Sequence, residues 1–244
     1  RGLGDVYKRQ ARILDQWRGR YELCTFPHGF SADSDEAAVR ALIAREKPDV
    51  IVHTAALSNT VYCASHPEES LRANVLLPEW IAKATAETGA KLLAFSSDQV
   101  YAGCKRSGPL PETLSLAPAN VYGCHKLEAE QRVLAITPGA ILLRAAWMYD
   151  FPGYRLPIRG NLPLNLLSAA KTGTALHFSE QDFRGVSYVR EVIDKLIPAM
   201  ELPGGVYNFG SGNDCDMFET VSRFAQFLGV KVPLEKTIGS ETLP

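Results

Sequence analysis

The sequence predicts an α/β fold built on a doubly wound parallel sheet, followed by a smaller C-terminal lobe. Apolar runs and amphipathic stretches alternate along residues 11–149, which is the pattern of strand–helix–strand units in a parallel sheet. The run at residues 48–56 is continuously apolar, as expected for a strand that is buried on both faces. Beyond Asp150 the composition changes to irregular, Pro- and Gly-containing segments, which marks the beginning of the lobe.

Composition and charge exclude several functional classes. The 244 residues are 46% hydrophobic and 22% charged, which is ordinary for a globular protein. The formal net charge of −1 provides no electrostatic attraction to nucleic acid or to a membrane surface. No apolar run approaches the roughly 18 residues of a spanning helix, and the N-terminus lacks the apolar core of a secretory signal. Five scattered cysteines without a Cys-x-x-Cys pair argue against a disulfide framework or a metal site, and they indicate reduced thiols in the cytoplasm.

The first half of the chain is predicted to alternate strands and helices. Residues 11–17 are typical of the second half of a helix, but residues 1–10 lack the apolar strand and Gly-rich turn that open a nucleotide-binding fold. Our hypothesis is that the first strand and the Gly-rich loop are missing and that an unrelated segment stands in their place. Asp33 and Glu36 are spaced as a helix cap and its partner. His53 is interpreted as a packed, hydrogen-bonded core histidine, because no second ligand stands at metal spacing. The predicted strands are 21–26, 48–56 and 92–96, and the predicted helices are 33–45 and 67–89.

The second half of the chain continues the alternation of strands and helices up to the strand at 140–144, and the lobe follows. A helical pattern begins near Lys126 and is followed by an apolar strand at 140–144. In the lobe we expect helices at 161–171, 189–196 and 217–228 and strands at 176–178 and 205–210.

The most informative stretch lies between residues 95 and 126. An apolar strand ends in Ser96-Ser97-Asp98, and a loop later Pro118-Ala-Asn-Val-Tyr122-Gly-Cys-His-Lys126 opens a helix. Tyr122 and Lys126 are four residues apart and therefore share one helix face. A serine hydroxyl at the nearby strand end would complete a catalytic trio. A second Tyr-x-x-x-Lys match, Tyr101 to Lys105, falls in turn-forming sequence, so we assign it no role.

A strand-end serine followed by Pro-x-Asn-x-Tyr-Gly-x-x-Lys resembles the extended short-chain dehydrogenase/reductase superfamily. Residues 96–101 and 144–149 are most similar to its dTDP-4-dehydrorhamnose reductase group, and the resemblance runs from about residue 11 to 228. It implies a Rossmann-like NAD(P)-binding domain at 11–149 and a mainly substrate-binding lobe at 150–244, from which 182–196 returns to the core. Asn74 matches a family position, and the family's further C-terminal helix is absent, so we expect truncation at both ends.

The resemblance also implies roles for individual residues. Tyr122 would donate a proton to the nascent alkoxide, and the positive charge of Lys126 would favour its phenolate, lowering a tyrosine pKa that is ordinarily about 10. Lys126 would also bind the nicotinamide ribose. Ser96 and Ser97 alternate across the strand, so only one can reach Tyr122, and the family motif selects Ser97 for the substrate carbonyl. The candidate cofactor-binding residues are Ala55, Ala56, Leu57, Tyr122 and Lys126, and the candidate substrate-binding residues are Ser97, Asp98, Trp147 and Arg184.

Three of these assignments have a structural alternative. Asp98 could contact substrate or cap the following loop. Trp147 could stack against the sugar or the nicotinamide, or pack as a core aromatic. Arg184 could pair with a nucleotide pyrophosphate, which suits its planar fork, or lie in solvent.

The implied function is NADPH-dependent reduction of the 4-keto group of dTDP-4-dehydrorhamnose to give dTDP-L-rhamnose. Pro27-His28-Gly29 stands where an acidic residue would bind the ribose of NAD. NADPH is therefore permitted, and NADH is not excluded. The rivals are a nucleotide-sugar epimerase or dehydratase with tightly held NAD, and a non-catalytic partner such as the regulatory subunit of methionine adenosyltransferase. We expect a nucleotide-sugar ligand and no nucleic-acid or membrane partner, and we leave a homodimer open. If the Gly-rich loop is missing, this polypeptide itself can be inactive.

Overall fold

The computed structural model describes residues 4–26, 34–106, 108–151 and 161–238, with side chains from Arg9 onward. The chain divides into two compact units. The first comprises Arg1–Ala145 and Ile193–Phe209, and the second comprises Ala146–Val192 and Gly210–Pro244. The chain thus leaves the first unit earlier than the change of composition at Asp150, and the segment that returns to it is Ile193–Phe209.

A parallel sheet forms the centre of the first unit. Among the described residues it has four strands in the order β1-β2-β3-β7. Every neighbouring pair is parallel, and Ser97, Ala145 and Phe209 lie opposite one another at the carboxyl ends of three strands. The Rossmann-like α/β fold is confirmed. The strands are β1 (Val50–His53), β2 (Lys91–Ser97), β3 (Ile141–Ala145) and β7 (Gly205–Phe209).

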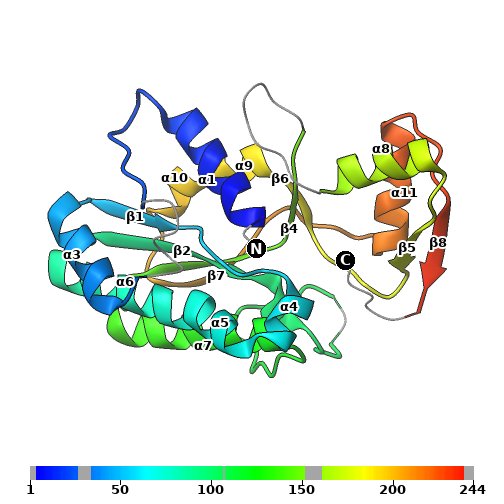
Figure 1. Ribbon diagram of the computed structural model, residues 1–244. Helices are drawn as coiled ribbons and strands as arrows, with labels where there is room; N and C mark the ends of the chain where they lie inside the picture. Colours follow the sequence, from blue (N-terminus) through cyan, green and yellow to red (C-terminus); the bar gives the residue numbers. More distant parts are fainter. Residues whose placement is uncertain (1–3, 27–33, 107, 152–160, 239–244) are drawn as a thin grey trace. The chain divides into compact units, whose positions relative to one another are not determined.

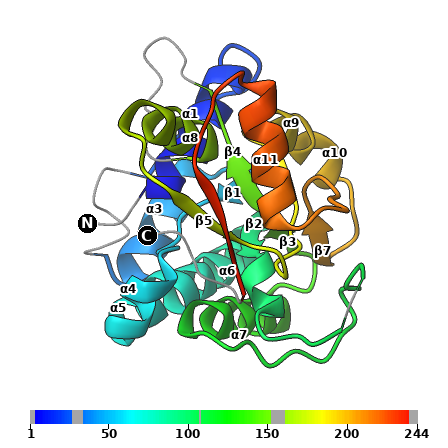
Figure 2. The ribbon, with the colours of Figure 1, turned by 90° about the vertical axis from the view of Figure 1, so that its right-hand side faces the viewer.

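Helices cover both faces of this sheet. Figures 1 and 2 show α6 and α7 on one face and α1 and α10 on the other. None of the described helices is long and apolar enough to cross a membrane. The helices of the first unit are α1 (Gly4–Trp17), α3 (Glu36–Glu46), α4 (Thr60–Ser65), α5 (Pro67–Leu71), α6 (Leu77–Thr88), α7 (Val121–Ile136) and α10 (Leu196–Ala199), with a π-helical turn η1 (Arg72–Leu76) and a 3-10 turn η2 (Asp98–Tyr101).

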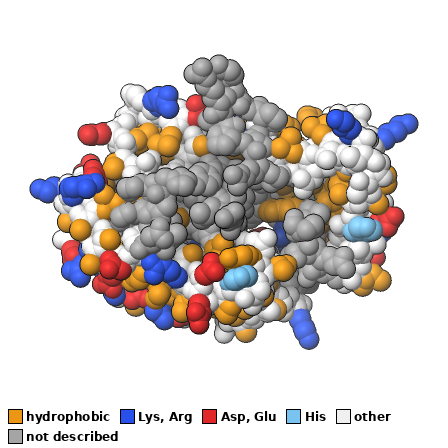
Figure 3. All heavy atoms as spheres, viewed as in Figure 1, with side chains coloured by type: hydrophobic (Ala, Val, Ile, Leu, Met, Phe, Trp, Pro, Cys, Tyr) orange, Lys and Arg blue, Asp and Glu red, His pale blue; other side chains and the backbone are white. Residues whose placement is uncertain are grey.

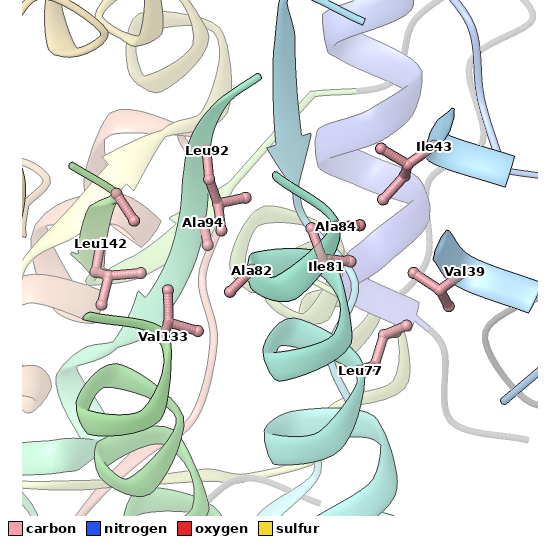
Figure 4. Packing of buried hydrophobic residues seen from close by; sticks show 11 residues of the cluster. Val39, Ile43, Leu77, Ile81, Ala82, Ala84, Leu92, Ala94, Val133 and Leu142 are labelled. Atoms are coloured by element: carbon pink, nitrogen blue, oxygen red, sulfur yellow. The ribbon is translucent and has the colours of Figure 1, made fainter. Parts of the chain in front are cut away.

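The main core lies between the sheet and the layer of α3, α6 and α7. Figure 4 shows Val39 and Ile43 of α3 directed toward Leu77 and Ile81 of α6, all of them buried. The apolar residues of β2 and β3 face Val133 of α7 in the same cluster. This burial supplies the hydrophobic stabilisation that holds α7, and therefore Tyr122 and Lys126, against the sheet. On the outer surface of these helices acidic and basic side chains are interspersed (Figure 3).

The second unit contains two small sheets. In its described part β4 (Trp147–Tyr149) pairs in parallel with β6 (Val186–Tyr188), and β5 (Leu176–Ser179) pairs in parallel with β8 (Leu234–Thr237). Helices α8 (Leu162–Thr172) and α11 (Met217–Phe227) pack Leu166, Met217 and Val221 into a separate core. Strand β8 was not predicted, because Leu-Glu-Lys-Thr carries little apolar signal of its own. The short helix α9 (Val189–Asp194) precedes α10.

The expected strand at 21–26 is wrong. In the described part of this segment only an isolated bridge joins Arg18 to Tyr21, and residues 22–26 have no regular structure. A parallel strand needs a neighbour to satisfy its backbone groups, and within the part of the chain that the structure describes β1 pairs only with β2. The helix expected at 11–17 is confirmed but longer, since α1 runs without a break from Gly4 to Trp17.

Helix α3 begins later than expected. Its N-cap is Asp35, whose side chain accepts a hydrogen bond from the backbone N–H of Ala38 at 2.9 Å. Asp33 and residues 27–29, which bore on the cap and on the choice between NADPH and NADH, lie outside the described residues.

His53 is packed as expected, but the expected hydrogen bond is not found at Nε2. The side chain is 6% exposed, and Nε2 has no hydrogen-bond partner among the residues that the structure describes. Burial, followed by the positive charges of Lys126 and Arg9, lowers the pKa of His53 to about 3. An imidazole in this position is therefore neutral throughout the physiological range.

His53→Leu should make the protein less sensitive to acid. An unfolded histidine binds its proton near pH 6.5, whereas the native one does so only near pH 3, so the free energy of unfolding falls as the pH is lowered between these values. The slope from this group is up to about 1.4 kcal/mol per pH unit, and the substitution removes it. Urea unfolding between pH 4 and 7 measures the slope. His177→Leu, at an exposed site, is the control and should leave it unchanged; an equal slope in the wild type and in His53→Leu would contradict the prediction.

Candidate active site

The site begins where β2 ends. Ser97 is the last residue of the strand, 8% exposed, and its hydroxyl donates to Asp98 Oδ1 at 3.1 Å. The Ser97 hydroxyl oxygen in turn accepts a hydrogen bond from the backbone N–H of Gln99 at 3.2 Å, and this caps the 3-10 turn η2. Ser97 is thus presented at the carboxyl edge of the sheet, where ligands bind in open α/β folds.

The turn η2 is held against the first turn of α7. Asn120 caps α7 by accepting from the N–H of Gly123 at 2.8 Å, and its own amide donates to Gln99 Oε1 at 3.0 Å. Gly123 is required there, because a Cβ atom at this position would overlap the Gln99 carbonyl oxygen and lie 2.9 Å from Pro118 Cβ. The Pro-x-Asn-x-Tyr-Gly pattern therefore holds the end of β2, which carries Ser97, next to the helix that carries Tyr122.

Tyr122 and Lys126 are both buried on α7, with 5% and 3% of their surface exposed. Tyr122 packs against Leu57 and Cys63. The Lys126 ammonium donates a 2.6 Å hydrogen bond to the backbone carbonyl of Phe95 on β2. The two side chains thus occupy the interface between α7 and the ends of β1 and β2.

The environment of Lys126 destabilises its charge. Burial, and after it the positive charge of Arg9, lower the pKa of Lys126 to about 8 against the opposing negative charge of Glu130. Because an unfolded lysine titrates near 10.5, the native state gains stability as the pH rises from about 8 toward 10.5. A lysine poised near neutral pH can exchange a proton during catalysis.

Residues 55–57, just beyond the end of β1, form a tightly held loop. Asn74, in the π-helical turn η1, accepts from the Leu57 N–H and donates to the Leu57 carbonyl, both at 3.0 Å. The Cys63 thiol donates to the same carbonyl at 3.2 Å. Ala55 and Ala56 precede Leu57 and add only methyl groups, so a flat ligand could approach the backbone closely. The family match at Asn74 thus has a structural reason.

Sequence reasoning missed a buried polar network beneath this site. Arg144 of β3 donates to both carboxylate oxygens of Glu130, at 2.7 Å from Nη2 to Oε2 and 3.0 Å from Nε to Oε1. The Ser96 hydroxyl donates to Glu130 Oε1 at 2.5 Å, and Arg144 Nη1 donates to the Tyr101 hydroxyl at 2.8 Å. The available signal was Arg144, a guanidinium within a strand predicted to be apolar. The Ser96 hydroxyl is therefore engaged by Glu130, whereas the Ser97 hydroxyl bonds at the strand end to Asp98 and to the Gln99 N–H.

Tyr101 holds a structural position. Its hydroxyl also donates to Asn208 Oδ1 at 2.8 Å, so Tyr101, the first residue of the second Tyr-x-x-x-Lys match, connects η2 to β7.

The second unit brings together Trp147 and Arg184. Parallel pairing of β4 with β6 places the Trp147 backbone N–H 3.1 Å from the Gly185 carbonyl. The Arg184 guanidinium lies 5.9 Å from the centre of the Trp147 ring and pairs with Asp182 at 2.8 Å. Arg184 Nε is buried and has no partner among the described residues. Within the described residues no cluster of three or more His, Cys, Asp and Glu side chains could hold a metal ion.

A protein-family model described as the RmlD substrate binding domain matches residues 28–244. The chain belongs to this family. Over most of its length it is similar to dTDP-4-dehydrorhamnose reductase of Aggregatibacter actinomycetemcomitans, with 26% identity over 87% of this chain and 71% of the relative.

Two further comparisons bear on fold and on function. The chain is 44% identical to methionine adenosyltransferase 2 subunit beta of Xenopus laevis, over 47% of this chain and about a third (34%) of that relative. The fold is similar to that of dTDP-4-dehydrorhamnose reductase of Bacillus anthracis solved in complex with NADP, with a TM-score of 0.85 and 19% identity over 97% of this chain and 81% of that one.

Gly123→Ala should loosen the site by separating α7 from η2. The added methyl group meets the Gln99 carbonyl, which is backbone and cannot rotate away, so we expect a loss of about 1–3 kcal/mol in the free energy of unfolding. Urea unfolding measures it. Gly139→Ala is the matched control, because a Cβ atom there meets nothing within 4 Å. Equal stability of the two variants would show that the close approach at Gly123 does not exist in solution.

Proposed function

We propose that the site reduces the 4-keto group of a nucleotide-linked deoxysugar with NADPH, converting dTDP-4-dehydrorhamnose to dTDP-L-rhamnose. The observation that carries the proposal is the burial of Tyr122 and Lys126 on the first turns of α7, docked through Gly123 and Asn120 against the strand end that bears Ser97. Membership of the RmlD family, and the relative named as this reductase, support the same reaction.

The residues present fit the nicotinamide-ribose end of the cofactor. The Ala55–Ala56 pair offers an approach free of large side chains, and Asn74 fixes the loop by both backbone groups of Leu57. When bound, the nicotinamide supplies the hydride. Lys126 offers an ammonium group at the same sheet edge for a ribose hydroxyl. We propose NADPH as the preferred cofactor and NADH as the alternative.

The protein's own contribution is proton delivery and polarisation. Tyr122 donates its phenolic proton to the oxygen of the reduced carbon, and the nearby Lys126 charge favours the phenolate that remains. When substrate binds, the Ser97 hydroxyl exchanges its hydrogen bond to Asp98 Oδ1 for one to the substrate carbonyl oxygen, while it still accepts from the Gln99 N–H. Such hydrogen bonds stabilise the charge that develops on the oxygen during reduction.

The second unit is proposed to bind the substrate. The Trp147 ring provides a stacking surface and Arg184 provides a planar fork for phosphate. Arg184 pairs with Asp182, and its buried Nε–H has no hydrogen-bond acceptor among the described residues. Asp98 accepts from Ser97, so we propose that it orients the serine as well as contacting the sugar.

A second candidate function is that of a non-catalytic regulatory partner. It is favoured by the 44% identity to a subunit of methionine adenosyltransferase, a relative of which this chain matches about a third. Membership of a fold family does not by itself decide between catalysis and binding.

Tyr122→Phe should abolish most reductase activity without abolishing cofactor binding. The substitution removes only the proton donor, so kcat should fall by about 10²–10⁴. NADPH and NADH binding are measured by fluorescence titration, and turnover by oxidation of NADPH with dTDP-4-dehydrorhamnose. Tyr62→Phe is the control, because its hydroxyl bonds only to Glu69 in this region and it lies in the same apolar cluster. Full activity of Tyr122→Phe would refute the assigned role.

The wild-type chain also distinguishes the two candidate functions. Turnover of the keto-sugar with NADPH supports the reductase. Absence of turnover together with tight binding to a methionine adenosyltransferase catalytic subunit would support the regulatory partner instead.

A further inference from the structure

Glu130 lies directly beneath the proposed catalytic lysine. It follows Lys126 by one helical turn on α7, so the two side chains share a face. Each is only 3% exposed. Both line one small cavity, together with His53 of β1 and Phe95 and Ser96 of β2.

The carboxylate is held from two strands. Ser96 of β2 donates to Oε1, and Arg144 of β3 donates to both oxygens. Arg144 is in turn fixed by the Tyr101 hydroxyl and the Glu112 carbonyl. A buried carboxylate with this many donors is held rigidly.

The charges around Lys126 come from several elements. Arg9 of α1 and Arg144 of β3 are cations, and His53 of β1 is neutral because burial and the nearby cations lower its pKa to about 3. Glu130 is the anion whose field stabilises the Lys126 ammonium, while Arg9 opposes it. Glu130 thus contacts one buried cation, Arg144, directly and acts on the other, Lys126, through its electric field.

We propose that Glu130 is a positioning residue of this site: as the buried anion shared by Lys126, Arg144 and Ser96, it holds the Lys126 ammonium and the end of β2 in the arrangement that Tyr122 requires. The inference rests on the proposed reductase function for its catalytic meaning, but the charge coupling can be measured without turnover.

Glu130→Gln is the direct test of this coupling. Glutamine keeps the size and the ability to accept from Ser96, but it leaves the two cations without their anion. Lys126 should then lose its proton at a pH about one unit lower or more. The alkaline limb of the pH profile of kcat/KM should move down by the same amount, because the ammonium form of Lys126 supports catalysis.

The measurement is an NMR pH titration of the protein labelled with ¹³C at the lysine Cε positions. The Lys126 signal is assigned with Lys126→Met. Glu128→Gln is the matched control, since it removes the same charge from the same helix at an exposed position that pairs with Arg132. Its Lys126 midpoint should equal that of the wild type. Glu130→Asp keeps the charge and should lie closer to the wild type than Glu130→Gln does.

Arg144→Met separates charge coupling from general damage. It removes the competing cation, so Lys126 should receive more of the Glu130 field and titrate at a higher pH than in the wild type. Opposite shifts in the two variants support the inference, and a Lys126 midpoint that is unchanged in folded Glu130→Gln overturns it. If Glu130→Gln does not fold, as judged by circular dichroism, the double variant Glu130→Gln/Arg144→Met, which buries no unpaired charge, decides, because its Lys126 midpoint should lie below that of Arg144→Met. If the wild type shows no reductase turnover, the proposed function fails while this titration still reports on Glu130.

Discussion

The hydrogen bond from the Lys126 ammonium to the Phe95 carbonyl ties the beginning of α7 to the end of β2. Because Tyr122 stands one turn before Lys126, the same bond keeps the phenol at the sheet edge beside the Leu57 loop. The beginning of α7 is also held against η2, because Asn120 caps the helix and bonds to Gln99. Gly123 has no side chain, so the Gln99 carbonyl can pack closely against it. Three segments that are distant in the chain therefore meet at one place, and the proposed chemistry depends on that meeting.

Such a site has to bury charge, and burial of charge is expensive unless the charges are paired and hydrogen-bonded. Glu130 and Arg144 form a bidentate pair with both side chains 4% exposed, and Ser96 and Tyr101 occupy further donor and acceptor positions. Lys126 is bonded to a carbonyl but remains sensitive to its neighbours, which is the condition under which a lysine can contribute to proton transfer. The network lies on the face of the sheet that α7 covers, directly under the residues assigned to catalysis.

The family resemblance and the structure answer different questions. Similarity to solved reductases establishes the fold, and the RmlD family model covers most of the chain. A dTDP-4-dehydrorhamnose reductase and a methionine adenosyltransferase 2 subunit beta are both among its relatives. Because a fold can serve either function, the choice between them rests on the site, where Ser97, Tyr122 and Lys126 are the residues proposed to act.

The sequence by itself determined the parallel α/β architecture and the motif residues, because hydrophobic periodicity and the spacing of Tyr122 and Lys126 are local properties of the chain. The features that the sequence did not predict depend on contacts between distant parts of the chain. Among the described residues, the segment at 21–26 pairs only through an isolated bridge from Tyr21 to Arg18, although its composition is typical of a strand. Strand β8 forms from a largely polar run because β5 lies beside it. The roles of Glu130 and Arg144 also emerged only in the folded state, since their partners come from β2, β3, η2 and α7. Tertiary structure decided these points because the stability of a strand edge or a buried charge depends on what packs against it.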